Sequence, residues 1–235
     1  MDEQKTNNKL TFFSGFFAGM AAVSVLGFII LLVIVFAQGT TDGTKAAGDE
    51  KAVVNEDNSV NQPVVAIKDS EYVRGNKDSK VEVIEYSDFE CPFCLKHYAT
   101  MNEVYKNYKD KAKFVFRHFP LSFHENAFKA AMAAECAGEQ GKFWEMHDKA
   151  FDANQTATMS VDTWKAAAKK LGLDTKKFNA CLDGDKYADK INNDIKEASA
   201  AGVSGTPATF INGEVVSGAY PYDTLKEKIE AALKQ

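Results

Sequence analysis

The sequence contains few of the residues that define the specialised classes of protein chain. Its 235 residues include only 4 cysteines, 5 prolines and 15 glycines, which excludes a collagen-like chain and a small domain held together by many disulfides. Basic residues are not in excess either, because 28 Lys and Arg face 33 Asp and Glu. Nucleic acid is therefore not expected as a partner, since binding a phosphate backbone needs clustered basic side chains.

Hydrophobic residues are concentrated near the N-terminus, where no charged side chain occurs from Leu10 to Thr41. The segment 11–37 is almost wholly apolar, and a helix of that length exceeds the ~30 Å hydrocarbon core of a bilayer at about 1.5 Å per residue. We therefore expect a transmembrane signal-anchor helix over 11–37, after a short tail of residues 1–10. A cleaved signal peptide is the alternative, but its apolar core is usually only about 7 to 15 residues long.

Residues 38–63 have the opposite character. They contain no aromatic residue, and valine is their only large aliphatic residue. Such a segment buries too little apolar surface to offset its conformational entropy, so we expect a disordered tether. The remaining residues, 64–235, form a chain long enough for one good hydrophobic core. One globular domain is predicted there.

The domain reads as two α/β halves separated by helices. Residues 81–86 and 113–119 have strand patterns and flank a helical pattern over 91–108, an order that requires a parallel strand pair. Helical patterns then cover 125–151, 161–171 after an N-cap at Ser160, a short helix after an N-cap at Asp174, and 187–202. A hairpin around Asn212-Gly213 and a helix over 222–233 close the chain. We therefore predict an α/β fold with an inserted helical subdomain at about 122–202.

The chemistry is expected at Cys91-Pro92-Phe93-Cys94, where a strand gives way to a helix. With Cys91 at the N-cap, Pro92 takes the first helical position, which suits its fixed φ and missing N–H. The Cys91 sulfur then faces unpaired backbone N–H groups, a setting that lowers a thiol pKa. Cys94 lies one turn further along and is more shielded. We expect Cys91 to be the sulfur that attacks a substrate disulfide or is attacked by a substrate thiolate, and Cys94 to resolve the mixed disulfide.

A metal site is the alternative for this motif, because Cys91, Cys94 and His97 have a ligand-like spacing. Zinc would need a fourth ligand and normally a second clustered pair. The other two cysteines stand alone, 45 residues apart, and Leu95 occupies the place where a c-type haem motif has histidine. We therefore favour redox chemistry without metal or bound organic cofactor, with His97 as a helix-surface or packing residue.

Two separated motifs resemble one known family. The segment Ser87-Asp-Phe-Glu-Cys-Pro-Phe-Cys94 is similar to the active site of the DsbA-like thioredoxin-fold disulfide oxidoreductases, and Gly202-Val-Ser-Gly-Thr-Pro-Ala-Thr-Phe-Ile-Asn-Gly213 is similar to their cis-proline segment. The resemblance covers roughly residues 72–233 and includes the inserted helical subdomain. It implies a thioredoxin fold, with a cis peptide at Thr206-Pro207 beside the active sulfurs. Thr206 is then expected to offer its backbone groups to an extended substrate segment.

Glu85 is the acid that we expect to serve the cysteines. Strand alternation places it on the face of Val81 and Val83, so a central strand would bury its carboxylate and raise its pKa. The resemblance implies the same role, since thioredoxin-like proteins keep an internal acid six residues before the first cysteine. A proton shuttle to Cys94 follows, with an exposed acid at a sheet edge as the alternative. Asp88 and Glu90 are expected to be loop residues whose charge opposes the thiolate.

Three further features qualify the resemblance. Phe93 stands where the strongest oxidants of the family have a histidine, which leaves the direction of the reaction open. Cys136 and Cys181 are predicted to form a structural disulfide, since the count is even and the domain is expected to lie outside the cytoplasm; two small buried side chains are the alternative. The other histidines and the tryptophans are expected to be cap or packing residues: His118, His124, His147, Trp144 and Trp164.

These expectations combine into one functional hypothesis. The chain is predicted to be a monomeric thiol:disulfide oxidoreductase, anchored by a single span in the inner membrane, with its catalytic domain on the periplasmic side. Its substrates would be reduced or misoxidised secreted proteins, and a quinone-linked membrane protein would reoxidise it. The alternatives are a reductase or isomerase fed by a membrane electron donor, or a non-enzymatic tethered module that binds zinc or unfolded chains.

Overall fold

The computed structural model describes residues 66–235. The predicted tail 1–10, the transmembrane segment 11–37 and the tether 38–63 lie outside these residues. Among the helices of residues 66–235, none has the length and apolar character needed to span a bilayer.

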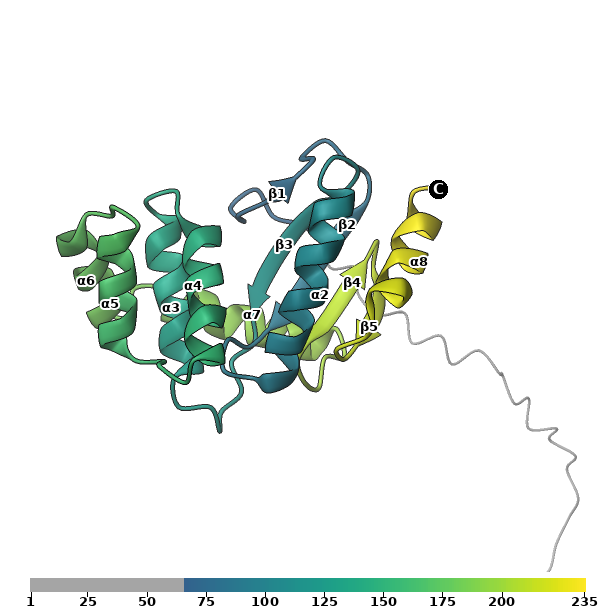
Figure 1. The fold of residues 1–235 in the computed structure, drawn as a ribbon. Coiled ribbons are helices and arrows are strands. Elements are labelled where there is room, and N and C mark those ends of the chain that lie inside the picture. The colour runs from purple at the N-terminus through teal and green to yellow at the C-terminus, as the bar shows by residue number, and fades with distance from the viewer. Residues whose placement is uncertain (1–65) are drawn as a thin grey trace, which may run out of the picture. The chain divides into compact units, whose positions relative to one another are not determined.

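A five-stranded mixed sheet forms the centre of the domain, with the strand order β1-β3-β2-β4-β5 (Figure 1). Only β2 and β3 are parallel, as the predicted crossover requires, and the other neighbours are antiparallel. The strands are β1 (Arg74–Gly75), β2 (Glu82–Ser87), β3 (Lys113–His118), β4 (Ala208–Ile211) and β5 (Glu214–Ser217). The short edge strand β1 is an addition to the predicted set, because two residues give no alternation to detect.

Helices cover both faces of this sheet. On one face, α2 (Pro92–Tyr108) and α8 (Tyr222–Ala232) bury an apolar cluster that includes Val83, Val104 and Leu225. On the other face, the end of α7 (Ala188–Ala200) packs Ala198 against Tyr86 and Phe210. Residues 88–91 link β2 to α2, so the end of β2 fixes the place where that helix begins.

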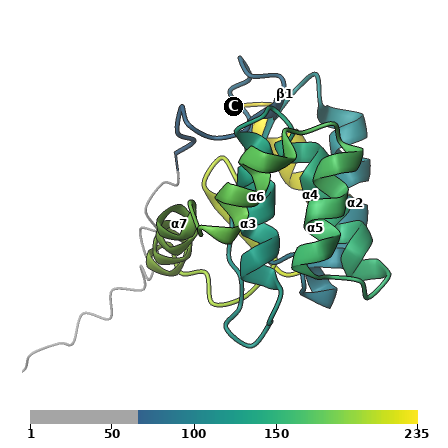
Figure 2. The ribbon, with the colours of Figure 1, turned by 90° about the vertical axis from the view of Figure 1, so that its left-hand side faces the viewer.

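The segment between β3 and β4 is the helical insertion. It contains α3 (Ala127–Gly138), α4 (Phe143–Gln155), α5 (Val161–Lys170), α6 (Thr175–Asp183) and then α7. Of these, α3 to α6 stand beside the sheet in Figure 1 and face the viewer in Figure 2. The predicted N-caps are present: the Ser160 hydroxyl accepts from Thr163 N–H, and the Asp174 carboxylate accepts from two backbone amides.

The prediction of one helical stretch over 125–151 is corrected by a turn at 139–142. Gly141 has φ +74°, a left-handed conformation that glycine adopts without a steric penalty, and it separates α3 from α4. The Lys142 amide then donates to the Ala137 carbonyl and closes the turn. The break lets α3 and α4 pack side by side in the insertion.

The core of the insertion extends to the start of α2. The same apolar cluster contains Trp164 and Phe178 in the insertion, Phe116 on β3, and both Cys91 and Cys94. The two cysteines therefore lie where the sheet half meets the helical insertion.

Candidate active site

Cys91 and Cys94 lie at the junction of β2 and α2. Cys91 is the N-cap residue of α2, with extended backbone angles (φ −70°, ψ 127°), and Pro92 is the first helical residue. Both cysteines are free thiols in the structure, and both are buried, at 4% and 0% exposure. Phe93 between them is 65% exposed. Within the motif, the Phe93 ring is therefore exposed to solvent, whereas the two cysteines are buried.

The two sulfurs differ in acidity. The pKa of the Cys91 thiol is lowered to about 5, first because the Cys94 side chain hydrogen-bonds to it, and further by the backbone groups of Cys94 and Phe93. Burial raises the pKa of Cys94, and the interaction with Cys91 raises it further. At neutral pH, Cys91 is thus the thiolate of the pair and Cys94 the thiol.

The second motif meets the first across the sheet. The Thr206-Pro207 peptide bond is cis, and the Cys91 sulfur lies 3.7 Å from the Thr206 carbonyl oxygen. The Pro207 carbonyl accepts from Gly218 N–H at 2.8 Å, which ties this segment to the end of β5. The structure therefore brings together Cys91, Cys94, Thr206 and Pro207 from positions more than 110 residues apart in the chain.

Glu85 is buried on β2, at 5% exposure. It lies opposite Phe116 on β3 and Thr209 on β4, and its Oε1 has no hydrogen-bond partner within the protein. His97 on α2 is fully buried beside it and hydrogen-bonds to the Thr209 hydroxyl at 2.9 Å. Burial lowers the pKa of His97, while the charge of Glu85 opposes that change. A carboxyl and an imidazole group are thus buried close enough for the charge of one to affect the other.

Asp88 and Glu90 lie in the loop between β2 and α2, as predicted, and their carboxylates have specific hydrogen-bond partners there. The Asp88 side chain is completely buried and accepts hydrogen bonds from Glu90 N–H, Leu121 N–H and His124 Nδ1. The Glu90 carboxylate accepts from Asn126 N–H at 2.6 Å. The donors Leu121 N–H and Asn126 N–H both belong to the segment after β3. The two carboxylates therefore hold that segment next to the motif.

Two of the histidines expected to cap or pack have more specific partners. His124 Nδ1 lies 2.8 Å from the Asp88 carboxylate. His118 Nε2 lies 2.9 Å from Glu135 in the buried contact between β3 and α3, where Lys190 also reaches that carboxylate. Sequence spacing gave no signal for these pairs, because their partners lie in other elements of the chain.

Cys136 and Cys181 form a disulfide between α3 and α6, with their Cα atoms 5.8 Å apart. The pair is buried inside the insertion, away from the Cys91 motif in the chain. Among residues 66–235, no group of three or more His, Cys, Asp or Glu side chains has the arrangement of a metal site.

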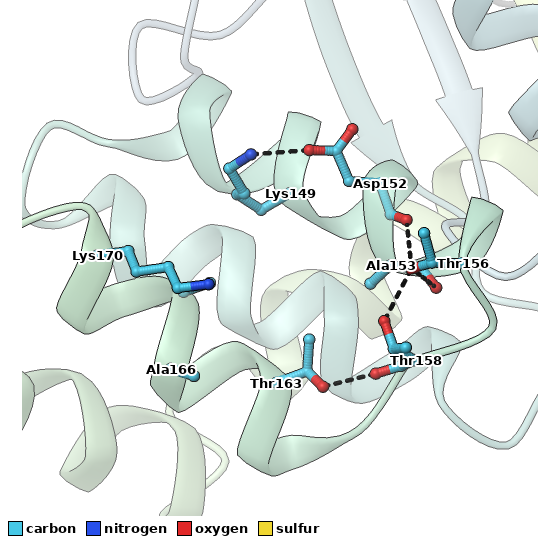
Figure 3. Close-up of a pocket in the computed structure, with 9 residues that line it drawn as sticks. Lys149, Asp152, Ala153, Thr156, Thr158, Thr163, Ala166 and Lys170 are labelled. Carbon is cyan, nitrogen blue, oxygen red and sulfur yellow. Dashed lines mark hydrogen bonds and ion pairs between the residues drawn. The ribbon is translucent and has the colours of Figure 1, made fainter.

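A surface cavity of about 390 Å³ lies between α4 and α5 in the insertion (Figure 3). Lys149, Asp152, Thr158 and Lys170 are among its lining residues. Lys149 is paired with Asp152 at 2.8 Å, and the Thr163 hydroxyl donates to the Thr158 carbonyl. Neither active cysteine lines this cavity, so the sulfur chemistry takes place elsewhere.

Comparison with known sequences gives one family model and a set of partial relatives. A family model described as Thioredoxin matches residues 67–231. The curated relatives include proteins named Na(+)/H(+) antiporter NhaA, from Salinispora tropica (38% identical over 165 residues) and Mycolicibacterium vanbaalenii (36% over 166 residues). These matches cover 70% and 69% of this chain. The chain spans only about a quarter of the length of these relatives (25% and 27%).

Solved structures with the same fold include BdbD from Bacillus subtilis, with 25% identity, a TM-score of 0.64, and coverage of 70% of this chain and 94% of that one. A thioredoxin-like oxidoreductase from Silicibacter pomeroyi is also 25% identical, with a TM-score of 0.61 and coverage of 72% and 95%. Wolbachia pipientis α-DsbA1 has the same fold at 23% identity, with a TM-score of 0.64 and coverage of 72% and 94%. The family match over residues 67–231 places this chain in the thioredoxin family, and the paired motifs and the helical insertion give it the fold of the DsbA-like members.

Proposed function

We propose that the chain catalyses disulfide exchange with protein substrates outside the cytoplasm and acts there as an oxidase. The observation that supports this best is the unequal pair of sulfurs at the start of α2. The pKa of Cys91 is lowered to about 5, whereas burial raises the pKa of Cys94. A stabilised Cys91 thiolate favours the reduced form of the pair, and a dithiol that prefers its reduced form is an oxidant of other thiols.

The reaction proceeds in two exchange steps. A substrate thiolate attacks the Cys91 sulfur of the Cys91–Cys94 disulfide, the bond between the two cysteines breaks, and its electron pair moves to Cys94, which then takes up a proton. A second substrate thiolate attacks the substrate sulfur of this mixed disulfide, and Cys91 leaves as a thiolate. The substrate has then lost two electrons and the enzyme has gained them. A quinone-linked membrane protein is the proposed acceptor of those electrons.

Three groups around the sulfurs are assigned supporting roles in this proposal. Glu85 supplies or removes the proton of Cys94; its support is that it is a buried acid whose Oε1 has no hydrogen-bond partner, on the strand that precedes the motif. Thr206 presents backbone groups to an extended substrate segment that docks beside Cys91. The exposed rings of Phe93 and Phe123, at 65% and 73%, offer apolar surface to the side chains of an unfolded substrate.

The cellular setting completes the proposal. Residues 11–37 anchor the chain in the inner membrane as a single span, and residues 38–63 tether the catalytic domain on the periplasmic side. Reduced or misoxidised secreted proteins are the substrates, and the enzyme is a monomer. The second candidate is a reductase or isomerase that uses the same cysteines, which Phe93 favours because this position lacks a hydrogen-bond donor for the thiolate.

The reduction potential of Cys91–Cys94, measured by equilibration with glutathione, separates these functions. A value near −120 mV supports the oxidase, and one near −270 mV supports the reductase, since these are about the potentials of strongly oxidising and reducing dithiols. A pair that does not exchange with glutathione at all contradicts both. Stoichiometric zinc in the purified chain, or binding of unfolded protein that survives Cys91→Ser, would favour a non-enzymatic module.

A further inference from the structure

Two loops meet beside the active cysteines. The first, residues 88–91, links β2 to α2 and is called the active-site loop; the second, residues 119–126, links β3 to α3 and is called the β3–α3 loop. Two carboxylates of the active-site loop accept backbone hydrogen bonds from the β3–α3 loop: Asp88 from Leu121 N–H at 2.7 Å, and Glu90 from Asn126 N–H at 2.6 Å.

Asp88 is the more constrained of the two. Its side chain is 0% exposed, whereas its partner His124 keeps 17% of its side-chain surface. One carboxylate oxygen accepts Glu90 N–H at 2.7 Å; the other accepts Leu121 N–H at 2.7 Å and lies 2.8 Å from His124 Nδ1. A carboxylate without access to water is stable only when such partners surround it. These contacts therefore hold residue 88 in one orientation.

The backbone of Asp88 contacts both active cysteines. Its N–H donates to the Cys94 sulfur at 3.4 Å, and its carbonyl accepts from the Cys91 N–H at 3.2 Å. Cys94 is itself completely buried, so water does not reach its sulfur to replace a missing donor. The Asp88 N–H thus points at the atom that receives the electron pair when the Cys91–Cys94 bond breaks.

We propose that Asp88, held in place by His124, is a positioning residue for the first exchange step, in which its backbone N–H stabilises the charge that forms on the departing Cys94 sulfur. The inference rests on the exchange chemistry proposed above. In that step the bond between Cys91 and Cys94 breaks, a bond between Cys91 and the attacking sulfur forms, and Cys94 leaves as a thiolate before it is protonated. Burial raises the pKa of Cys94, and the Ser87 and Thr206 side chains together with the Asp88 N–H oppose that rise. A donor fixed before the reaction stabilises charge that appears only during it.

The two steps of exchange give this role a distinct signature, because Cys94 leaves only in the first. The experiment uses the oxidised full chain and measures the rate at which reduced glutathione attacks the Cys91–Cys94 bond at pH 7. We expect Asp88→Ala to slow this step about 10-fold, since the donor remains but is no longer held, and complete loss of such a donor slows reactions by about 100- to 1,000-fold. Asp88→Asn, a milder change, is expected to slow it less.

The second step is measured with Cys94→Ser, in which glutathione attacks a preformed mixed disulfide on Cys91 and Cys91 is the leaving group. Adding Asp88→Ala to this variant is expected to change the rate less than twofold. An equal slowing of both steps would show that Asp88 only maintains the fold, and would overturn the proposal.

Variants of the neighbouring residues complete the test. His124→Leu removes the partner of Asp88 and is expected to slow the first step, whereas His124→Asn keeps a donor near the Nδ1 position and is expected to restore it to within about twofold. Glu90→Gln is the matched control, because that side chain ties the same two loops without contacting Asp88. The proposal is wrong if Glu90→Gln slows the first step as much as Asp88→Ala, or if Asp88→Ala leaves it unchanged. A wild-type chain that does not react with glutathione would instead contradict the proposed function.

Discussion

The four cysteines form two pairs with different states, although all four belong to one apolar cluster. Cys136 and Cys181 are at 0% and 5% exposure and are bonded across two helices of the insertion. Cys91 and Cys94, at 4% and 0%, are free thiols. Burial therefore does not distinguish the pairs.

The polar backbone around the sulfurs does distinguish them. Cys91 is the N-cap of α2, with the Thr206 carbonyl 3.7 Å away, and Cys94 receives the Asp88 N–H. Cys94 lies in the first turn of α2, whereas Cys136 and Cys181 lie beyond the first turns of α3 and α6, where the helix already uses the backbone N–H groups. The comparison indicates that unpaired backbone groups decide which sulfurs react.

Removing each cysteine pair in turn is expected to give the largest effects. Loss of the active pair should affect the exchange rate, and loss of the structural pair should affect stability. Cys91→Ser should abolish exchange with glutathione, because it deletes the attacked sulfur. The double change Cys136→Ala with Cys181→Ala should leave the exchange rate within about threefold of wild type. It should lower the free energy of unfolding by up to about 4 kcal/mol, the chain-entropy value for a loop closed over 45 residues.

Urea unfolding and a glutathione exchange assay on the same preparations test this separation. Loss of exchange in the Cys136/Cys181 variant while it remains folded would show that the two pairs are not independent, and would contradict the comparison.

Glu85→Gln is expected to give the next largest effect, because it deletes the buried carboxylate proposed as the proton acceptor without changing the size of the side chain. Release of glutathione from a mixed disulfide on Cys91 requires the Cys94 thiol to lose its proton, and general-base catalysis contributes about 100-fold or more to such steps. We expect this release to be about 100-fold slower at pH 7. Glu82→Gln is the matched control on the same strand, where the carboxylate is partly exposed and paired with Lys113 at 2.9 Å. Equal rates in the two variants would remove Glu85 from the mechanism.

Local patterns in the sequence predicted the elements around both pairs. Alternation located β2 and β3, the Asn212-Gly213 turn located the β4–β5 hairpin, and short polar caps located the starts of α5 and α6. The Cys91-Pro92 pair predicted where α2 begins, because proline suits the first helical position and leaves the preceding cysteine as the N-cap. The helical insertion was recognised from its periodicity.

These local patterns do not predict contacts between segments that are distant in the sequence. The Asp88–His124 pair joins residues 36 positions apart, and neither residue has a spacing that points to the other. The break between α3 and α4 was missed because apolar residues keep helical spacing across it, although Gly141 marks the turn. Cysteine count alone left both states of Cys136 and Cys181 open, because pairing depends on how α3 and α6 pack.

The lowered pKa of Cys91 makes the stability of the reduced chain depend on pH. The thiol has a pKa of about 5 in the folded state against an ordinary value of 9.0, so between these values the unfolded chain binds a proton that the folded chain does not. Stability then rises with pH from about 5 to 9, and this contribution is lost as the pH falls through 5. The free energy of unfolding of the reduced wild type should therefore rise relative to that of Cys91→Ser from pH 5 to pH 8. A constant difference over this range would contradict the thiolate assignment; the oxidised chain, which has no Cys91 thiol, serves as the control.

The smallest effect is expected from Phe93, which is 65% exposed and makes the apolar side of the motif. Phe93→His places an N–H donor beside the Cys91 thiolate, and a charge-assisted hydrogen bond to that sulfur stabilises the reduced form. We expect the reduction potential to become more positive by about 30 mV, which is a tenfold change in the exchange equilibrium. Phe93→Leu supplies no donor and should change the potential by less than about 10 mV on the same scale. Equal shifts in both variants would mean that loss of the aromatic ring, and not the new donor, changes the reduction potential. The Phe93 ring would then join the backbone groups in determining how oxidising this pair is.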